Sequence, residues 1–244
     1  MSASQAARVC RFDAPLGYAR AVALQEKLVQ ERIAGRIPDT MLLLQHPPTI
    51  TLGRRGRREH LLVSDAALAA LGVELHLSAR GGDVTYHAPG QWVLYPIFKL
   101  GAAEMGTHGY LRALESLALQ TACTFGVDAF RKEGKAGAWC PQGKFAAIGF
   151  KFTRWVSWHG LSFNVSLDLS GFDLIVGCGL VGERVTSLAE VLGEAVPDMD
   201  AVGDALLRQA TQVFERTFQP MTPAELWDSV GGTLTASGPD KFGA

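Results

Sequence analysis

A cysteine between two glycines is the residue of this sequence best suited to covalent chemistry. Cys178 stands in Val176-Gly177-Cys178-Gly179-Leu180, where small neighbours leave the thiol accessible. Backbone N–H groups of the flanking glycines can point at an oxygen bound beside the sulfur, which is what a nucleophile in acyl transfer needs. The alternative is a structural role, because most free cysteines are small buried hydrophobic residues.

A nucleophilic cysteine needs a partner, because a thiol with a pKa of about 8.5 is mostly protonated at neutral pH. His87 and His159 are the usual type of general base. Lys144 is a third candidate because it opens an apolar strand, where desolvation lowers the pKa of a lysine. It could then accept the thiol proton or, as a cation, stabilise the thiolate. A lysine at a strand end is more often solvated, and that alternative stays open.

A glycine-rich corner brings a cation and a histidine together. Arg80-Gly81-Gly82 allows a tight turn and close backbone approach. Val84 and the later run from Trp92 to Ile97 are typical of strands, while His87 and the following Pro-Gly cannot be helical. The two interpretations are a binding corner and an ordinary hairpin with a structural histidine.

The sequence has one dense charge run, Gly53-Arg54-Arg55-Gly56-Arg57-Arg58. It is either a solvated basic loop or the place where a negatively charged partner is steered in.

Composition excludes several classes of protein. The 244 residues are 48% hydrophobic and 19% charged with a net charge of −1, which is typical of a compact protein without a general bias toward nucleic acid or membranes. No signal peptide or membrane span is recognisable. The four cysteines and six histidines are scattered, so neither a disulfide framework nor a metal site is expected. We expect a cytoplasmic protein.

Hydrophobic periodicity predicts alternating helices and strands around one core, an α/β (α+β) single domain over residues 1–244. The predicted core covers about residues 15–215, and residues 231–244 are expected to form a flexible tail. Helices are predicted over 16–34, 65–71, 107–125, 188–192 and from Asp200 onward, with Thr107 and Ser187 as N-caps and one more turn starting at Thr222. Strands are predicted at 41–44, 49–52, 73–77, 127–131 and 137–140. A longer antiparallel pair is predicted at 144–150 and 155–165.

Ordered motifs along the chain resemble those of the lipoyl(octanoyl) transferase family of lipoate biosynthesis. The motifs are His46-Pro47-Pro48, Thr51-Leu52-Gly53-Arg54, Glu59-His60-Leu61-Leu62, Arg80-Gly81-Gly82-x-Val84-Thr85-x-His87-x-Pro89-Gly90-Gln91, Gly143-Lys144-x-Ala146-Ala147-Ile148-Gly149, His159-Gly160-Leu161-x-x-Asn164-Val165, Cys178-Gly179-Leu180 and Val185-Thr186-Ser187-Leu188.

The resemblance implies a mixed sheet flanked by helices, as in the catalytic domain of biotin and lipoate protein ligases. It implies transfer of an octanoyl group from octanoyl-acyl carrier protein to Cys178, and then to a lysine of a lipoyl domain. The implied acceptors are 2-oxoacid dehydrogenase complexes and the glycine cleavage H protein, and the enzyme is expected to be a monomer. Lys144 would lower the pKa of the thiol. Because a thioester is already activated, no cofactor or metal is needed.

The resemblance also implies which residues line the acyl site. They come from three segments: Arg80, Gly81, Gly82, Asp83, Val84, Thr85, Tyr86 and His87; Ala147, Ile148 and Gly149; and Gly160, Leu161 and Ser162.

Three residues depart from the family pattern. Gly177 replaces an expected proline, Ala88 replaces a commoner glycine, and Cys140 replaces an aliphatic residue and is interpreted as core packing.

Two other functions fit the same fold. An ATP-dependent lipoate or biotin protein ligase would use the 53–58 loop for nucleotide and would not need Cys178. A catalytically inactive module that binds acyl carriers would need neither Cys178 nor Lys144.

Overall fold

The computed structural model describes residues 5–101, 105–176 and 182–231. Within them, eight strands form the main sheet in the order β11-β1-β2-β6-β10-β9-β8-β7. β1 pairs in parallel with β2 and β11, and all the other pairs are antiparallel. The fold is therefore an α/β fold with a mixed sheet, as predicted. The strands are β1 (Gln5–Arg11), β2 (Asp39–Leu44), β6 (Gln91–Ile97), β7 (Phe130–Lys132), β8 (Lys135–Cys140), β9 (Gly143–Thr153), β10 (Val156–Asn164) and β11 (Arg216–Met221).

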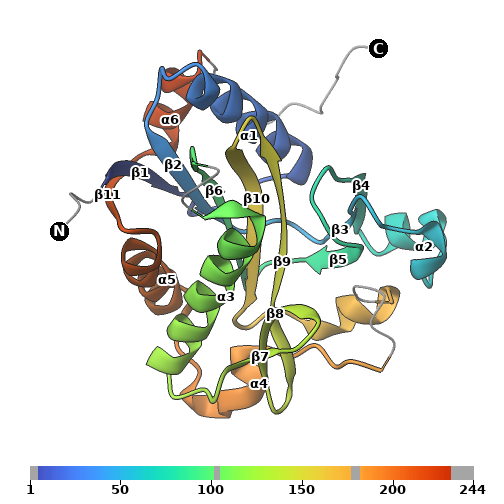
Figure 1. Ribbon diagram of the computed structural model, residues 1–244. Helices are drawn as coiled ribbons and strands as arrows, with labels where there is room; N and C mark the ends of the chain where they lie inside the picture. Colours follow the sequence, from blue (N-terminus) through green and yellow to red (C-terminus); the bar gives the residue numbers. More distant parts are fainter. Residues whose placement is uncertain (1–4, 102–104, 177–181, 232–244) are drawn as a thin grey trace.

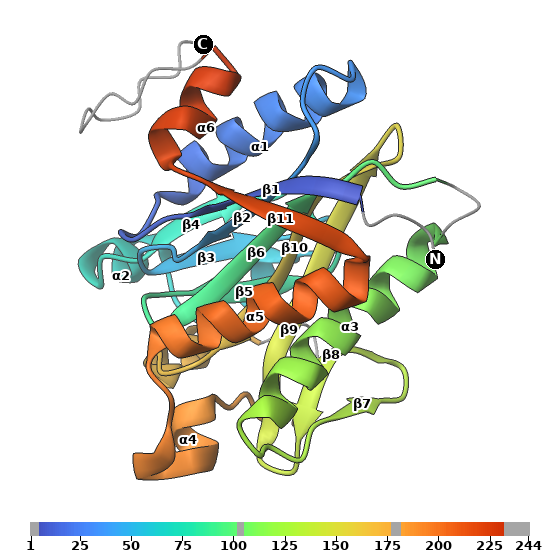
Figure 2. The ribbon, with the colours of Figure 1, turned by 90° about the vertical axis from the view of Figure 1, so that its left-hand side faces the viewer.

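Helices cover both faces of the main sheet, which explains its continuous apolar strands. On β2, Met41 and Leu43 pack into the core beneath α3 (Gly106–Thr124) and α5 (Met199–Phe214). Leu42 and Leu44 pack into the opposite core with α1 (Tyr18–Ile33) and α6 (Pro223–Ser229). Alternate side chains of a strand point to opposite faces of the sheet, so the side chains on both faces must be apolar when both faces are covered. Figure 1 and Figure 2 show α3 and α5 side by side on one face and α1 on the other.

A three-stranded sheet lies beside the main one, in the order β4-β3-β5. It is made of β4 (Glu74–Leu77), β3 (Thr49–Leu52) and β5 (Val84–His87), and α2 (Asp65–Ala70) lies next to it (Figure 1). The short elements η1 (Arg58–His60), η2 (Leu169–Leu174), α4 (Leu188–Leu192) and η4 (Gly193–Ala195) complete the described chain.

The corner after Arg80 is not a hairpin. β5 pairs with β3 in the small sheet, whereas β6 pairs with β2 and β10 in the main sheet. The turn at Pro89-Gly90 thus carries the chain from one sheet to the other. Gly90 is required there, because a Cβ would lie 2.5 Å from the backbone nitrogen of Leu167.

Most predicted elements are confirmed, including the long antiparallel pair, now β9 and β10. Two helix starts need correction. The N-cap of α3 is Met105 without a side-chain bond, so the prediction of Thr107 was wrong. α5 starts at Met199, capped by Asp198, and not after Asp200. Ser187 caps α4 as predicted, its hydroxyl accepting from Glu190 N, and the Glu190 carboxylate bonds Thr186 and Arg184.

The predicted flexible tail falls almost entirely on residues 232–244, which lie outside the described residues. Among the described residues, no helix is both long enough and apolar enough to cross a membrane.

A buried carboxylate ties four segments of the fold together. Asp39, 3% exposed, accepts hydrogen bonds from Arg32 Nε of α1 at 2.7 Å and from the backbone nitrogen of Lys99 at 2.8 Å through Oδ1. Its Oδ2 accepts from Arg216 Nε of β11 at 2.7 Å. Arg216 is itself buried and lies 4.7 Å from the Phe98 ring centroid.

We predict that Asp39→Asn destabilises the protein by about 3 kcal/mol or more, because it leaves the buried Arg216 without its counter-charge. The substitution is nearly isosteric, so packing is unchanged. Thermal or denaturant unfolding measures the loss. Asp200→Asn is the matched control, since Asp200 pairs with Arg11 but is 85% exposed, and an exposed pair contributes less than about 1 kcal/mol. Equal losses in the two variants would contradict this role of Asp39.

Candidate active site

A cavity that is open to solvent lies where the segment from Arg80 to His87 passes over β9 and β10, with about 460 Å³ of empty space including the solvent at its mouth. Eleven of the residues that the resemblance implied for the acyl site line it. Gly81, Val84 and Tyr86 do not: Val84 lines an adjacent cavity, and Tyr86 packs against Phe172 in the core of the small sheet. The lining residues are Tyr18, Arg80, Gly82, Asp83, Thr85, His87, Val93, Tyr95, Ala147, Ile148, Gly149, His159, Gly160, Leu161 and Ser162.

Backbone contacts between the two sheets hold the Arg80 segment in place. Gly81 N donates to the carbonyl of Phe150 on β9 at 3.0 Å. On the other side, the backbone nitrogens of Gly53, Arg54 and Arg55 donate to carbonyls of Asp83, Arg80 and Gly82. The Arg80 guanidinium donates to the carbonyl and hydroxyl oxygens of Thr51 at 2.6 and 2.8 Å. The wall of the cavity is therefore fixed before any ligand binds.

Two glycines let the backbones that frame this cavity approach one another closely. A Cβ on Gly149 would lie 2.7 Å from the carbonyl oxygen of Gly81, and one on Gly160 would lie 2.5 Å from that of Leu94. These positions must be glycine for the backbones to approach so closely. The pocket that results is lined largely by glycine, alanine and aliphatic surface, which suits a hydrocarbon chain.

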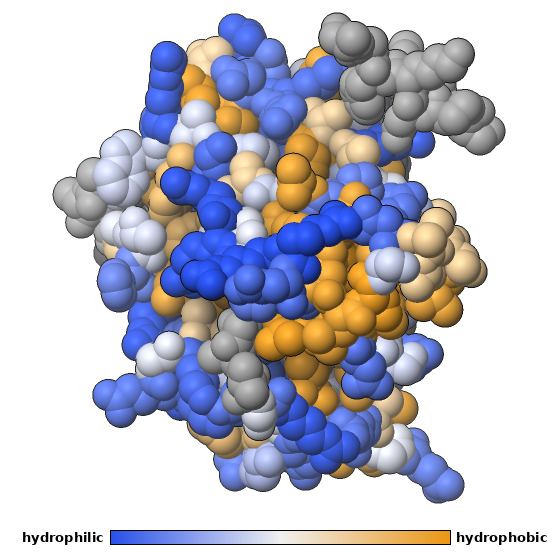
Figure 3. Space-filling view, turned by 90° about the vertical axis from the view of Figure 1, so that its right-hand side faces the viewer, coloured by the Kyte–Doolittle hydropathy of each residue, from blue (hydrophilic) through white to orange (hydrophobic). Residues whose placement is uncertain are grey.

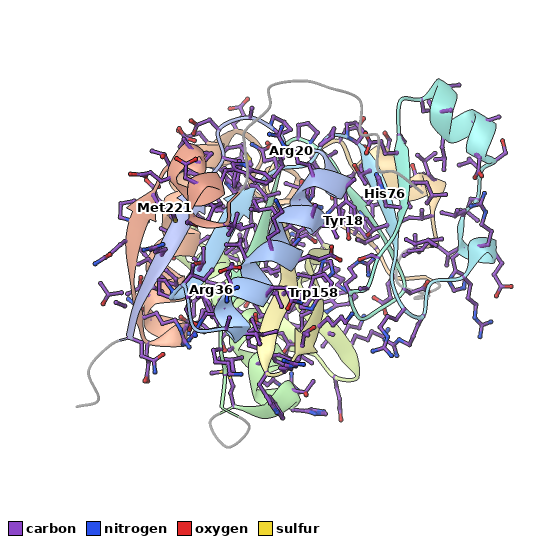
Figure 4. All side chains as sticks on the ribbon, turned by 90° about the horizontal axis from the view of Figure 1, so that it is seen from above. Tyr18, Arg20, Arg36, His76, Trp158 and Met221 are labelled. Carbon is purple, nitrogen blue, oxygen red and sulfur yellow. The ribbon has the colours of Figure 1, made fainter. Side chains whose placement is uncertain are left out.

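The buried histidines at and next to this cavity are uncharged. Burial lowers the pKa of His87 to about 3 and that of His159 to about 3, with the nearby Arg80 adding to both shifts. Burial likewise lowers the pKa of His46, which bonds Tyr95 OH at 2.7 Å, to about 4. Tyr18 contributes from the start of α1, next to His76 (Figure 4). These histidines are neutral at physiological pH, so His87 and His159 are poor proton acceptors.

Lys144 lines a second cavity of about 420 Å³ that shares Thr85, Ala147 and Ser162 with the first. Its backbone is fixed at the start of β9, donating to the Arg184 carbonyl at 2.8 Å and accepting from Thr186 N at 3.0 Å. The residue is 8% exposed. Lys144 is therefore a buried residue beside the first cavity.

Two residues that shape the position of Lys144 were not found from the sequence. A Cβ on Gly137 would lie 2.5 Å from Lys144 Cε, so only glycine leaves space for the lysine stem. The Trp139 ring centroid lies 5.5 Å from Nζ, within the range of a cation–π contact. The sequence offered no signal for either, because both lie on β8 and act across the strand pair.

The predicted nucleophile, Cys178, lies outside the described residues, as does Gly177. Among the described cysteines, Cys10 is fully buried and its pKa is raised to about 12 by burial. Burial also raises the pKa of Cys140, which packs in the main core as predicted. Cys123 is exposed. Neither buried thiol is suited to act as a nucleophile.

The predicted basic loop leaves β3 and runs along the cavity wall. Arg57 Nη1 bonds Glu59 at 3.0 Å, and Arg58 bonds Asp65. Arg54 and Arg55 are exposed and make no ion pair with the residues that the structure describes. On the face that carries the small sheet, hydrophilic side chains form a band beside apolar surface (Figure 3).

Comparison of the sequence with known proteins identifies the family. The lipoyl protein ligase A/B catalytic domain family matches residues 17–211. An octanoyltransferase of Syntrophotalea carbinolica is 49% identical over 73% of this chain and 82% of its own length. An octanoyltransferase of Chloroflexus aurantiacus is 48% identical over 82% of this chain and 90% of its own length.

Solved structures support the fold at much lower identity. A lipoate-protein ligase A bound with ATP superposes with a TM-score of 0.73 at 15% identity, covering 93% of this chain and 92% of that one. The bi-partite lipoate protein ligase of Thermoplasma acidophilum superposes with a TM-score of 0.72 at 16% identity, covering 93% of this chain and 90% of that one. At this identity the likeness concerns the fold alone, whereas the octanoyltransferases are similar throughout the shared sequence. The chain therefore belongs to the octanoyltransferase family and is an acyltransferase.

Proposed function

We propose that this enzyme takes an octanoyl group from octanoyl-acyl carrier protein as a thioester on Cys178 and passes it to a lysine of a lipoyl domain. The acceptors would be the 2-oxoacid dehydrogenase complexes and the glycine cleavage H protein. The observation that carries the proposal is the pair of contiguous cavities, one with mainly apolar exposed surface, the other lined by the buried Lys144.

The first cavity supplies the binding energy for the acyl chain. Each buried CH₂ contributes about 0.8 kcal/mol, so an eight-carbon chain in this pocket gains several kcal/mol. The neutral histidines at its deep end add no charge that would have to be desolvated. The binding residues proposed here include Gly81, Val84 and Tyr86, which support the cavity wall from behind.

The second cavity supplies the electrostatic partner of the thiol. The described chain is anchored both before and after Cys178. Val176 N donates to the carbonyl of His60, and Arg184 and Thr186 bond the backbone of Lys144. A lysine cation favours the thiolate and lowers the pKa of a nearby thiol. The Cys178 thiolate attacks the thioester carbonyl, and the carrier leaves as a thiolate that takes a proton from the Lys144 ammonium. The lysine regains its proton from solvent, and the acyl-enzyme remains for the second partner.

We predict that Cys178→Ser reduces octanoyl transfer to a lipoyl domain to the uncatalysed background while the melting temperature stays within a few degrees. A hydroxyl is nearly isosteric with a thiol but is a far weaker nucleophile at neutral pH. Transfer assays and intact mass after incubation with octanoyl carrier protein measure the effect. An octanoyl adduct that maps to the exposed Cys123 instead would refute the assignment.

We predict that alkylation of the Cys178 thiol in the wild-type enzyme follows a pKa below about 8.5, and that Lys144→Ala raises this pKa. The cation favours the thiolate, so its loss raises the pH needed to ionise the thiol. Transfer should slow by about two orders of magnitude or more. Lys144→Arg keeps the cation but should rescue transfer poorly, because a guanidinium cannot give up a proton to the departing thiolate of the carrier.

Lys151→Ala is the matched control for that series, because Lys151 lies on the same strand but its amine packs over Trp158. It should leave the alkylation profile unchanged. The same profile in Lys144→Ala and wild type would remove the lysine from the mechanism.

We predict that Arg54→Glu with Arg55→Glu raises the apparent KM for octanoyl carrier protein at low salt by about tenfold. These side chains are exposed and unpaired among the described residues, and their backbone adjoins the cavity wall, so they can steer an acidic partner. Arg57→Glu with Arg58→Glu is the matched control, with a smaller effect, because both arginines already hold acidic neighbours.

Salt and an uncharged donor complete the test of the arginines. The rise in apparent KM that the Arg54→Glu, Arg55→Glu variant shows should fade as the salt concentration is raised. It should be absent with an uncharged octanoyl thioester as donor. Equal losses with both donors would show that the loop shapes the acyl site and does not steer partners.

A further inference from the structure

A histidine and a carboxylate form a close pair at the edge of the acyl cavity. His60 Nδ1 lies 2.6 Å from Asp83 Oδ2. The contact is close but bent, so it falls short of a well-formed hydrogen bond, as is common for catalytic pairs before substrate binds. The side chain of His60 is 22% exposed and that of Asp83 only 11%. Nδ1 is thus directed at the carboxylate, which leaves Nε2 as the nitrogen available to accept a proton.

Both members of the pair are anchored beside the cavities. Asp83 lines the acyl cavity, and the next two residues, Val84 and Thr85, line the cavity of Lys144. The carbonyl of His60 accepts a hydrogen bond from Val176 N at 2.8 Å. The pair therefore sits where the chain that leads to Cys178 meets the cavity wall. Asp83 Oδ1 is buried and has no hydrogen-bond partner among the described residues.

The second half of the proposed reaction requires a proton acceptor that the first half does not. The lysine of the acceptor arrives as an ammonium with a pKa of about 10.4 and must lose a proton before its nitrogen can attack. Attack forms the C–N bond and breaks the C–S bond, and the nitrogen loses its second proton as the amide forms. The Lys144 cation is already engaged in stabilising the departing thiolate.

Among the described residues, the other histidines of the cavity region are unsuited to this task. Burial lowers the pKa values of His46, His87 and His159 to between about 3 and 4, so these rings hold protons too weakly at neutral pH. His60 differs from them in its partial exposure and its carboxylate partner. Exposure also gives the proton a route to solvent.

We propose that His60 is the general base for the acceptor lysine and that Asp83 is its positioning residue, an inference that rests on the function proposed above. Nε2 of His60 takes the proton from the incoming ammonium, and the neutral amine attacks the octanoyl thioester of the enzyme. The Cys178 thiolate leaves and is stabilised by the Lys144 cation. The second proton of the nitrogen passes to solvent. The carboxylate of Asp83 fixes the ring with Nδ1–H toward it and stabilises the imidazolium that forms.

The test separates the two half-reactions in the full-length enzyme. His60→Asn keeps an N–H donor near the position of Nδ1, so the contact with Asp83 survives while the proton acceptor is lost. Single-turnover acylation by octanoyl carrier protein should stay within about twofold of wild type. Transfer from the isolated acyl-enzyme to a lipoyl domain should slow by about 10²-fold or more.

His76→Asn is the matched control, because His76 forms a similar pair with Glu74, with Nε2 at 2.8 Å from Oε2, but does not line the cavity. It should leave both half-reactions unchanged. Hydroxylamine supplies a second readout, since this amine is already neutral at neutral pH. Its attack on the acyl-enzyme should be nearly the same in His60→Asn and wild type.

Three results would overturn the inference. They are an unchanged transfer rate in His60→Asn, equal slowing of acylation and transfer, and equal slowing with lysine and hydroxylamine. An acyl-enzyme that fails to form in the wild type would instead refute the function proposed above, so the two failures are distinguishable.

Discussion

The backbone of Arg80 to Asp83, held between two sheets, is the constraint on which the site depends. One side of this segment bonds the loop after β3, and the other bonds Phe150 on β9. Glycine at positions 53 and 149 lets both neighbours approach within distances that a Cβ would block. This clamp holds the small sheet against the main sheet along the wall of the first cavity. The proposed acyl site is thus a product of backbone packing, so little ordering of its wall is needed when substrate binds.

Charge is distributed so that each part of the site has a different environment. The deep end of the acyl cavity holds neutral histidines, joined to the framework by the bond from His87 Nδ1 to Gln91 and from Gln91 to Asn164. Asn164 in turn donates to the Thr186 carbonyl, next to the backbone partner of Lys144. One hydrogen-bonded chain therefore connects the apolar pocket with the lysine. Exposed cations remain at the rim, where solvent keeps their interactions weak and sensitive to salt.

The sequence predicted the residues that line the cavity better than it predicted the strands that frame the fold. Motif order identified most of the lining, because those residues are contiguous along the chain. β1 and β11 were missed: β11 contains Pro220, which is tolerated only because the strand is at the sheet edge. The separation of β5 from β6 was also invisible, since a local pattern shows where a strand lies and not which strand it pairs with. The role of Gly137 and the pairing of His60 with Asp83 could not be predicted, because both depend on contacts between segments that are distant in sequence.

In the proposed reaction the octanoyl group is held covalently by this enzyme after it leaves the donor and before it reaches the acceptor. The most direct measurement is chemical competence of an isolated acyl-enzyme. The wild-type enzyme is loaded from octanoyl carrier protein, freed of donor, and mixed in a rapid-quench experiment with a lipoyl domain. We predict that the label leaves the enzyme and appears on the acceptor lysine at the same rate, at least as fast as steady-state turnover. Label that stays on the enzyme, or reaches the acceptor only when the donor is also present, would contradict the account.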